Sequence, residues 1–130
     1  MRKAVLVYPE LSYKLNGIFF AVHNELGRFR NEQQYCDAIE AYLRLYGVPY
    51  EREKVLPLSF PGEQAGRNKV DFLIAAKIVI ELKARRVIER SDYYQAKRYL
   101  VTLGKKLALL VNFREKFLRP KRILNASAAE

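Results

Sequence analysis

The sequence predicts an α/β domain in which a central mixed β-sheet of four or five strands is flanked by helices, in the order ααβββαβ. Three observations predict this class. Two segments before Gly47 repeat apolar residues at helical spacing, the segment after Tyr50 changes to a two-residue alternation, and an uninterrupted apolar run follows a third helical segment. A length of 130 residues is usual for one domain, so we expect residues 1–130 to fold as a single unit.

Two helices are expected at the start of the chain. Residues 11–26 carry apolar side chains at helical spacing, and Pro9 and Gly27 suit the beginning and the end of this helix. The second helical pattern covers residues 32–46, and Asn31 is its expected N-cap. Both helices therefore precede the first strand.

Three strands are expected next. Residues 50–60 alternate in the two-residue rhythm of a strand, and Pro57 places this strand at an edge of the sheet or at a bulge. A turn over residues 61–66 separates it from two further strand-like runs, at residues 70–75 and 78–82. Together the three segments predict a meander.

The last third of the chain predicts one helix and a buried strand. Ser91 is the expected N-cap of a helix that ends at about Leu103, and residues 107–113 form a continuous apolar run suited to a buried strand. Residues 121–124 are a candidate edge strand. Residues 125–130 are expected to form a frayed tail.

The composition excludes several classes of protein. No stretch approaches the roughly 18 consecutive apolar residues of a membrane-spanning helix, so no membrane partner is expected. The apolar run near Met1 is too short for the core of a signal peptide. A lone cysteine, Cys36, allows no internal disulfide and fits a reducing compartment, so we expect a cytoplasmic location.

The positive charge is unevenly distributed along the chain. Residues 1–82 carry 11 basic and 10 acidic side chains, whereas residues 83–130 carry 13 basic and 4 acidic ones, out of a net charge of +10. Binding of Lys and Arg side chains to phosphates releases counterions, and this release favours binding. The asymmetry therefore favours a nucleic-acid partner. A solvated basic surface that aids solubility explains the charge alone equally well.

Two carboxylates and a lysine are expected to meet at one end of the sheet. Asp71 lies in one predicted strand, and Glu81 and Lys83 close the next, so a short connection returns both carboxylates to the same end. Glu81 and Lys83 are two residues apart and share a face, while Leu82 points to the other face and leaves its carbonyl near the first. Carboxylate and carbonyl oxygens are ligands that Mg²⁺ accepts. The pattern predicts a divalent-metal site.

These residues resemble the D…(D/E)xK signature of the PD-(D/E)XK nuclease superfamily, with Asp71 ten residues before Glu81. Two further features are similar to the superfamily. Glu32 stands early on the second helix, where members often carry an additional acidic residue. Gln95 and Tyr99 resemble the QxxxY motif of superfamily exonucleases and share one helical face.

The chain also resembles the GxxExxY proteins, a compact branch of that superfamily. The similarity covers about residues 11–124 and includes Glu32 and Tyr35. Two positions depart from the patterns. Phe29 stands where the glycine of the branch is expected, and Val70 stands where the superfamily name has proline.

The resemblance implies a restriction-endonuclease-like fold and a metal-dependent phosphodiesterase that hydrolyses the DNA backbone, with Mg²⁺ or Mn²⁺ as cofactor. RNA is left open as a substrate. The implied catalytic residues are Asp71, Glu81, Lys83, Glu32 and Gln95, and the implied metal ligands are Asp71, Glu81, Leu82 and Glu32. In these roles Lys83 positions or activates the attacking water, Glu32 holds a metal or its water, and Gln95 orients the lysine or a phosphate.

Nucleic-acid contacts are expected on the third helix and just before it. The expected residues are Arg85, Arg86, Arg90, Lys97 and Arg98, with Tyr94 placed to stack on a base. A homodimer is expected, because single-domain nucleases often act on a duplex as symmetric pairs. The alternative function is a catalytically idle module that binds nucleic acid or protein and retains the fold.

His23 and Cys36 are expected to have structural roles. His23 is the only histidine and lies in a mostly apolar helical stretch, without a second histidine to help bind a metal. Cys36 is expected to be a small core residue on the second helix. Neither is therefore assigned to the site.

Overall fold

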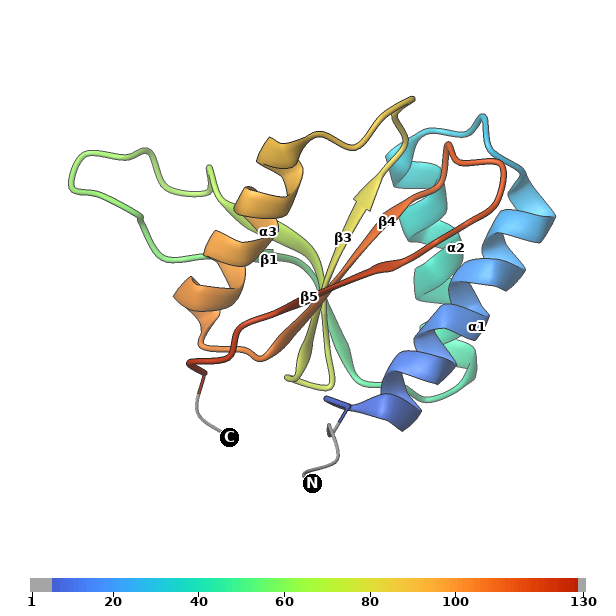
Figure 1. Ribbon diagram of the computed structural model, residues 1–130, viewed down its shortest axis with the longest axis horizontal. Helices are drawn as coiled ribbons and strands as arrows, with labels where there is room; N and C mark the ends of the chain where they lie inside the picture. The colour runs from blue at the N-terminus through green and yellow to red at the C-terminus, as the bar shows by residue number, and fades with distance from the viewer. Residues whose placement is uncertain (1–5, 129–130) are drawn as a thin grey trace, which may run out of the picture.

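The computed structural model of the protein describes residues 6–128, which form a five-stranded sheet with three helices (Figure 1). The helices are α1 (Pro9–Leu26), α2 (Glu32–Leu45) and α3 (Arg90–Leu103). The strands are β1 (Tyr50–Val55), β2 (Lys69–Ile74), β3 (Ile78–Lys83), β4 (Leu107–Asn112) and β5 (Lys121–Leu124). Among the described residues, no helix is both long enough and apolar enough to cross a membrane.

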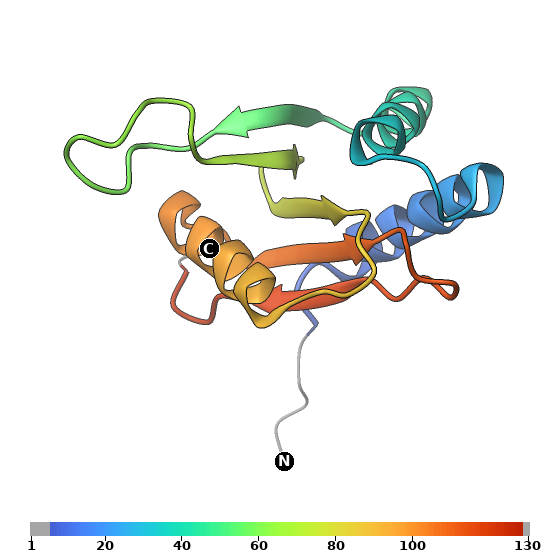
Figure 2. The ribbon, with the colours of Figure 1, turned by 90° about the horizontal axis from the view of Figure 1, so that it is seen from above.

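The sheet is mixed, as the sequence predicts. Its strands follow the order β1-β2-β3-β4-β5, with β3 and β4 parallel and the other neighbours antiparallel. The parallel pair requires a crossover, and α3 supplies it on one face of the sheet. Helices α1 and α2 cover the other face (Figures 1 and 2).

Two apolar clusters hold the helices to the sheet. The larger cluster joins α1 and α2 to one face and includes Phe19, Phe72 and Leu82, which are fully buried. The smaller cluster lies under α3 and includes Leu100 and Val79. Burial of each such side chain contributes about 1.5–3 kcal/mol to the free energy of folding. The helices are therefore firmly packed on both faces of the sheet.

Tyr35 anchors the α1–α2 loop to the end of β4. Its hydroxyl donates to the Gly27 carbonyl at 2.6 Å and accepts the Arg30 N–H at 3.2 Å. Its ring stacks on Phe113 with 4.4 Å between ring centroids. One side chain therefore fixes both ends of the loop and joins them to the sheet.

The first strand is shorter than the sequence predicts. β1 ends at Val55, not at residue 60, although it is an edge strand as Pro57 indicates. The Leu56 N–H still donates to the Asn68 carbonyl at 2.8 Å. Pro57 has no N–H with which to continue the pairing, so the chain leaves the sheet there. The following loop, residues 56–68, projects from the body of the molecule (Figure 1).

The start of α3 and the C-terminal tail differ from the sequence prediction. Glu89 is the N-cap of α3, not Ser91, and its N–H donates to the Asp92 carboxylate at 2.8 Å. The chain after β5 is not frayed from residue 125. Asn125 is buried, its N–H donates to the Lys106 carbonyl at 2.9 Å, and its side chain donates to the Lys105 carbonyl at 3.2 Å. Residues 129–130 of the predicted tail lie outside the described part.

His23 and Cys36 have the structural roles that the sequence predicts. The His23 Nε2 lies 2.8 Å from the Glu115 carbonyl oxygen, which ties α1 to the loop after β4. Cys36 is 3% exposed and belongs to the larger apolar cluster. Burial raises the pKa of its thiol to about 12, so Cys36 is a poor nucleophile.

Candidate active site

The carboxylates of Asp71 and Glu81 lie between β2 and β3 and interlock with the backbone of the facing strand. The regular pairing of the two strands reaches Phe72 and Ile80 and goes no further toward Asp71. There the Leu82 N–H donates to Asp71 Oδ2 at 2.7 Å, and the Asp71 N–H donates to Glu81 Oε1 at 3.1 Å. Side-chain oxygens thus replace backbone carbonyls as acceptors, and they bring the two carboxylates together at one end of the sheet.

The alternation of β3 places Glu81 and Lys83 on the α3 side of the sheet. Leu82 is fully buried in the larger cluster, under α1 and α2, so its two neighbours in sequence point the other way. Burial raises the pKa of both carboxyl groups, and the charge of the half-buried Lys83 opposes this shift. The shared face of Glu81 and Lys83, expected from their spacing, is confirmed.

Burial makes the carboxylate pair a site for positive charge. Glu81 is 5% exposed, and burial, followed by the charge of Asp71, raises its pKa to about 8. Burial also raises the pKa of Asp71, and the hydrogen bond from Leu82 opposes this shift. Two adjacent buried carboxyl groups ionise reluctantly unless a cation compensates them.

The oxygen donors of the site fit Mg²⁺ or Mn²⁺. Two carboxylates with the adjacent Leu82 carbonyl form a hard, oxygen-only donor set, and such ions commonly take one or two carboxylates and complete their shell with water and phosphate. Within residues 6–128, no group of three or more His, Cys, Asp or Glu side chains is close enough together to hold a metal. Asp71 and Glu81 are thus the two carboxylates that the backbone hydrogen bonds bring together here.

Glu32 acts on the pair through its charge. It is half-buried in the first turn of α2, and it raises the pKa of both Asp71 and Glu81. This contribution is smaller than that of burial, and it indicates that Glu32 lies within electrostatic range of the pair. A direct bond from Glu32 to a metal stays a prediction, because the side chain does not form a three-ligand cluster with the pair in this structure.

A second acidic residue faces the pair from β1, and the sequence analysis did not identify it. Glu53 is exposed and has a φ of 53°, in the left-handed region that non-glycine residues rarely adopt. It stands between Arg52 and Lys54, which pair with Phe72 and Val70 on either side of Asp71. Its charge raises the pKa of Asp71. Backbone strain of this kind is often found at functional sites. It cannot be predicted from residue spacing, so the sequence analysis did not find Glu53.

Helix α3 packs on the face of the sheet to which Glu81 and Lys83 point. Tyr99 is 7% exposed, and burial, followed by the charge of Glu81, raises its pKa. Gln95 lies one turn earlier on the same helix and is half-buried. The QxxxY residues therefore lie on the helix that packs against this face of the sheet.

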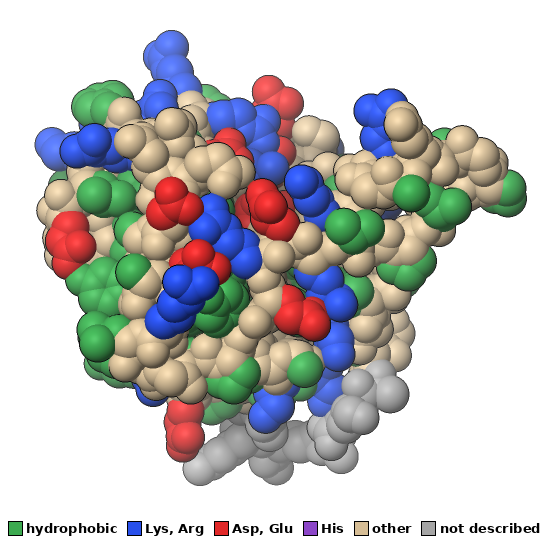
Figure 3. Space-filling view, turned by 180° about the vertical axis from the view of Figure 1, so that it is seen from behind, with side chains coloured by type: hydrophobic (Ala, Val, Ile, Leu, Met, Phe, Trp, Pro, Cys, Tyr) green, Lys and Arg blue, Asp and Glu red, His purple; other side chains and the backbone are tan. Residues whose placement is uncertain are grey.

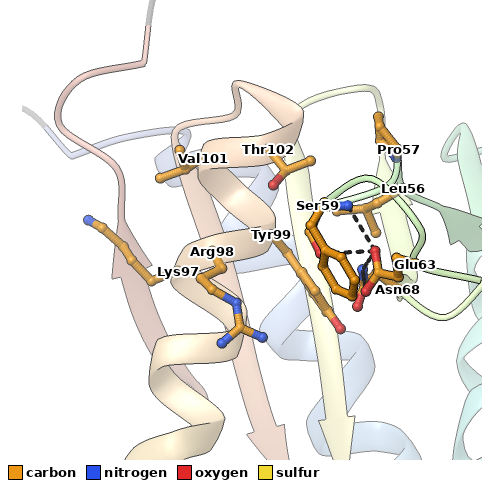
Figure 4. Close-up of a pocket in the computed structure, with 11 residues that line it drawn as sticks. Leu56, Pro57, Ser59, Glu63, Asn68, Lys97, Arg98, Tyr99, Val101 and Thr102 are labelled. Carbon is orange, nitrogen blue, oxygen red and sulfur yellow. Dashed lines mark hydrogen bonds between the residues drawn. The ribbon is translucent and has the colours of Figure 1, made fainter.

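A cavity of about 570 Å³ lies between α3 and the loop of residues 56–68 (Figure 4). The Glu63 carboxylate holds the loop together by accepting hydrogen bonds from Ser59 and Asn68. These bonds lower the pKa of Glu63, and the bond from the Ser59 N–H has the largest effect. Neither Asp71 nor Glu81 lines the cavity. Tyr99 lines the cavity, and after burial the charges of Glu81 and Asp71 contribute to its raised pKa, so Tyr99 adjoins the cavity and lies within electrostatic range of the carboxylates.

Two of the six residues predicted to contact nucleic acid already have protein partners. Arg85 forms a salt bridge with Asp92, which is buried, and Lys97 donates to the Leu124 carbonyl. The others are exposed, with Tyr94 at 59%. These exposed residues are Arg86, Arg90, Arg98 and Tyr94.

Asn112 is a further positioning residue that the sequence analysis did not identify. It is 2% exposed and faces Lys83 across the β3–β4 pair. Its Oδ1 accepts the N–H groups of Arg85 and Arg114 at 3.1 and 3.2 Å, and its Nδ2 donates to the Arg85 carbonyl at 2.6 Å. Asn112 therefore fixes the chain directly after Lys83. The sequence feature that could have identified Asn112 is its place as a polar residue within the apolar run of residues 107–113.

The chain is similar to one protein family and to a solved structure. The family model described as the PD-(D/E)XK nuclease superfamily matches residues 9–123. Among solved structures, the chain is similar to an alkaline exonuclease, LHK-Exo, from Laribacter hongkongensis, with a TM-score of 0.52 and 13% sequence identity over 98% of this chain and 74% of the other. At this identity the likeness establishes the fold. A search of curated proteins found no match. Membership of the GxxExxY branch stays a prediction.

Proposed function

This chain belongs to the PD-(D/E)XK nuclease superfamily, and from this premise we propose that it hydrolyses phosphodiester bonds of DNA with the help of Mg²⁺ or Mn²⁺. The observation that carries the proposal is the interlocked carboxylate pair of Asp71 and Glu81, with Lys83 on the same face. Two buried carboxylates beside a lysine are costly for a fold to retain unless a cation and an anion bind there.

Each residue of the site has a distinct role in this proposal. Asp71 and Glu81 hold the ion, which when bound supplies Lewis acidity toward the phosphate. The Lys83 ammonium orients the phosphate or the attacking water and stabilises negative charge as it develops. Gln95, which is half-buried on α3, is proposed to orient Lys83 or a phosphate oxygen.

The alternative function, an idle binding module, leaves the site unexplained. Such a module accounts for the net charge of +10 and for the exposed arginines. It does not explain why the fold retains a carboxylate whose pKa is raised to about 8 by burial and by a second carboxylate. The pair also repels nucleic acid when no cation is bound.

Cleavage by purified protein tests the proposal. We expect hydrolysis of at least one substrate in a panel of labelled linear, nicked, branched and single-stranded DNA and RNA with Mg²⁺ or Mn²⁺, and none with chelator. Calorimetry should also detect metal binding that Asp71→Ala removes. If no substrate is cut and no such binding is detected, the idle module is the correct function.

The exposed arginines around α3 are expected to set the salt dependence of DNA binding. Replacing Arg86, Arg90 or Arg98 by Glu should weaken binding, because each phosphate contact releases counterions. The slope of log affinity against log salt should fall by about one for each lost contact. Lys14→Glu is the matched charge reversal on α1, which covers the opposite face of the sheet. Equal slopes for the α3 variants and Lys14→Glu would place the DNA elsewhere.

A homodimer and a cytoplasmic location also remain proposals. The homodimer is supported by the small size of a 130-residue domain, which contacts few nucleotides by itself. The location is supported by the single cysteine, which allows no internal disulfide.

A further inference from the structure

Phe29, in the loop between α1 and α2, is a large apolar side chain presented to solvent between two arginines. Its side chain is 76% exposed. The guanidinium carbons of Arg28 and Arg114 lie 5.1 and 5.5 Å from the centroid of its ring. An exposed aromatic ring flanked by cations is a surface suited to a flat, electron-rich ligand that carries negative charge.

The exposure of Phe29 is enforced by its surroundings. Arg28 Nε donates to the Arg114 carbonyl at 2.9 Å, and Arg114 Nε donates to the Arg28 carbonyl at 2.7 Å. This reciprocal pair clasps the α1–α2 loop to the loop after β4. The Tyr35 hydroxyl binds Gly27 and Arg30 on either side of Phe29. The ring is therefore held outward by a rigid loop.

The clasp is joined to the end of the sheet that carries Lys83. The Arg114 N–H donates to Asn112, which faces Lys83 in the β3–β4 pair. The Phe113 N–H donates to the Lys83 carbonyl at 2.9 Å. The α1–α2, β3–α3 and β4–β5 loops all lie at the same end of the molecule, at the top of Figure 1. The loop that carries Phe29 thus lies at the same end of the molecule as Lys83.

The charges around Phe29 favour a polyanion over a protein partner. Arg28 and Arg114 lie over the ring, and Arg30 and Lys116 belong to the same two clasped loops, in which Glu115 is the acidic residue. A base of a nucleic acid stacks on an aromatic ring, while its flanking phosphates pair with guanidinium groups. An apolar peptide would gain nothing from these cations.

We propose that Phe29 is a stacking platform for an unpaired base of the nucleic-acid strand that enters the active site. A base inside a duplex is already stacked on both faces, so the platform requires a single strand, an overhang or a branch point. The inference rests on the proposed nuclease function and narrows its substrate to nucleic acid with unpaired nucleotides near the cleaved bond.

Fluorescence of 2-aminopurine tests the platform. The probe is a labelled duplex with a single-stranded overhang, carrying 2-aminopurine at successive overhang positions and bound in the presence of chelator. We expect stacking to quench the fluorescence at one or two positions for the wild-type protein and for Phe29→Trp. Phe29→Ala should abolish the quenching and weaken overhang binding about tenfold or more, with fully paired duplex affected less.

Tyr13→Ala is the matched control, because Tyr13 is 83% exposed and lies on α1 about 20 Å of helix before the loop. It should bind and quench like wild type. The platform is refuted if Phe29→Ala still quenches and binds like wild type, or if wild type binds and cuts the overhang without quenching. In both cases the nuclease function stands. Failure of the wild-type protein to bind or cut any nucleic acid would instead remove both proposals.

Discussion

Replacement of Asp71 by Asn or Ala, or of Glu81 by Gln or Ala, is expected to lower metal-dependent cleavage by about a thousandfold or more. Each change removes one of two anionic metal ligands, and bound divalent ions contribute several kcal/mol to catalysis in sites of this kind. Asp71→Asn is the informative variant, because its amide oxygen can still accept the Leu82 N–H. If this variant loses activity, the cause is the missing negative charge and not a disturbed fold. Calorimetric titration with Mn²⁺ should show weaker metal binding.

Nucleic-acid binding by the same variants should persist or tighten, because one negative charge no longer repels the phosphates. Lys83→Ala should behave differently. It should bind metal nearly as wild type does but slow the single-turnover rate, since the lysine acts on the reacting groups and not as a ligand. A co-purified contaminating nuclease would ignore all of these changes. Wild-type cleavage rates in the carboxylate variants would therefore refute the site.

Glu81→Gln is expected to stabilise the metal-free protein at alkaline pH, by up to roughly 5 kcal/mol. The pKa of Glu81 is about 8 in the folded chain, against 4.5 for an ordinary glutamate, chiefly because the side chain is buried. Between these values the unfolded chain releases the proton and the folded chain retains it. Stability conferred by the protonated group is therefore present below about pH 4.5 and lost as pH rises through 8. Gln cannot ionise, so it avoids this loss.

Denaturant unfolding at pH 5 and pH 9, with and without Mg²⁺, measures the effect. The free energy of unfolding of the wild-type protein should fall between the two pH values by more than that of Glu81→Gln. Added Mg²⁺ should restore part of the wild-type stability at pH 9, because the ion favours the ionised pair. Glu10→Gln is the matched control for removal of a glutamate at the surface. Parallel pH profiles for wild type and Glu81→Gln would contradict the proposed electrostatics.

The sequence by itself determined the order of elements and the shared face of Glu81 and Lys83. Both depend on local geometry, because helical and extended segments repeat their side-chain directions every 3.6 and two residues. The same alternation placed Leu82 in the core. The short connection after Asp71 was enough to bring the two carboxylates to one end of the sheet, because an antiparallel hairpin fixes which residues face each other.

Contacts between residues distant in the sequence were decided only by the tertiary structure. Asp71 and Glu81 accept backbone N–H groups across two separating strands, and Asn112 fixes the chain after Lys83 from 29 positions further along. The sequence shows that Phe29 stands where glycine is expected. It does not show that the ring points outward, because that orientation depends on Arg114 in another loop. Residue spacing records the direction of each side chain along its own element. The partner that the side chain meets is set by how the elements pack, which no local pattern contains.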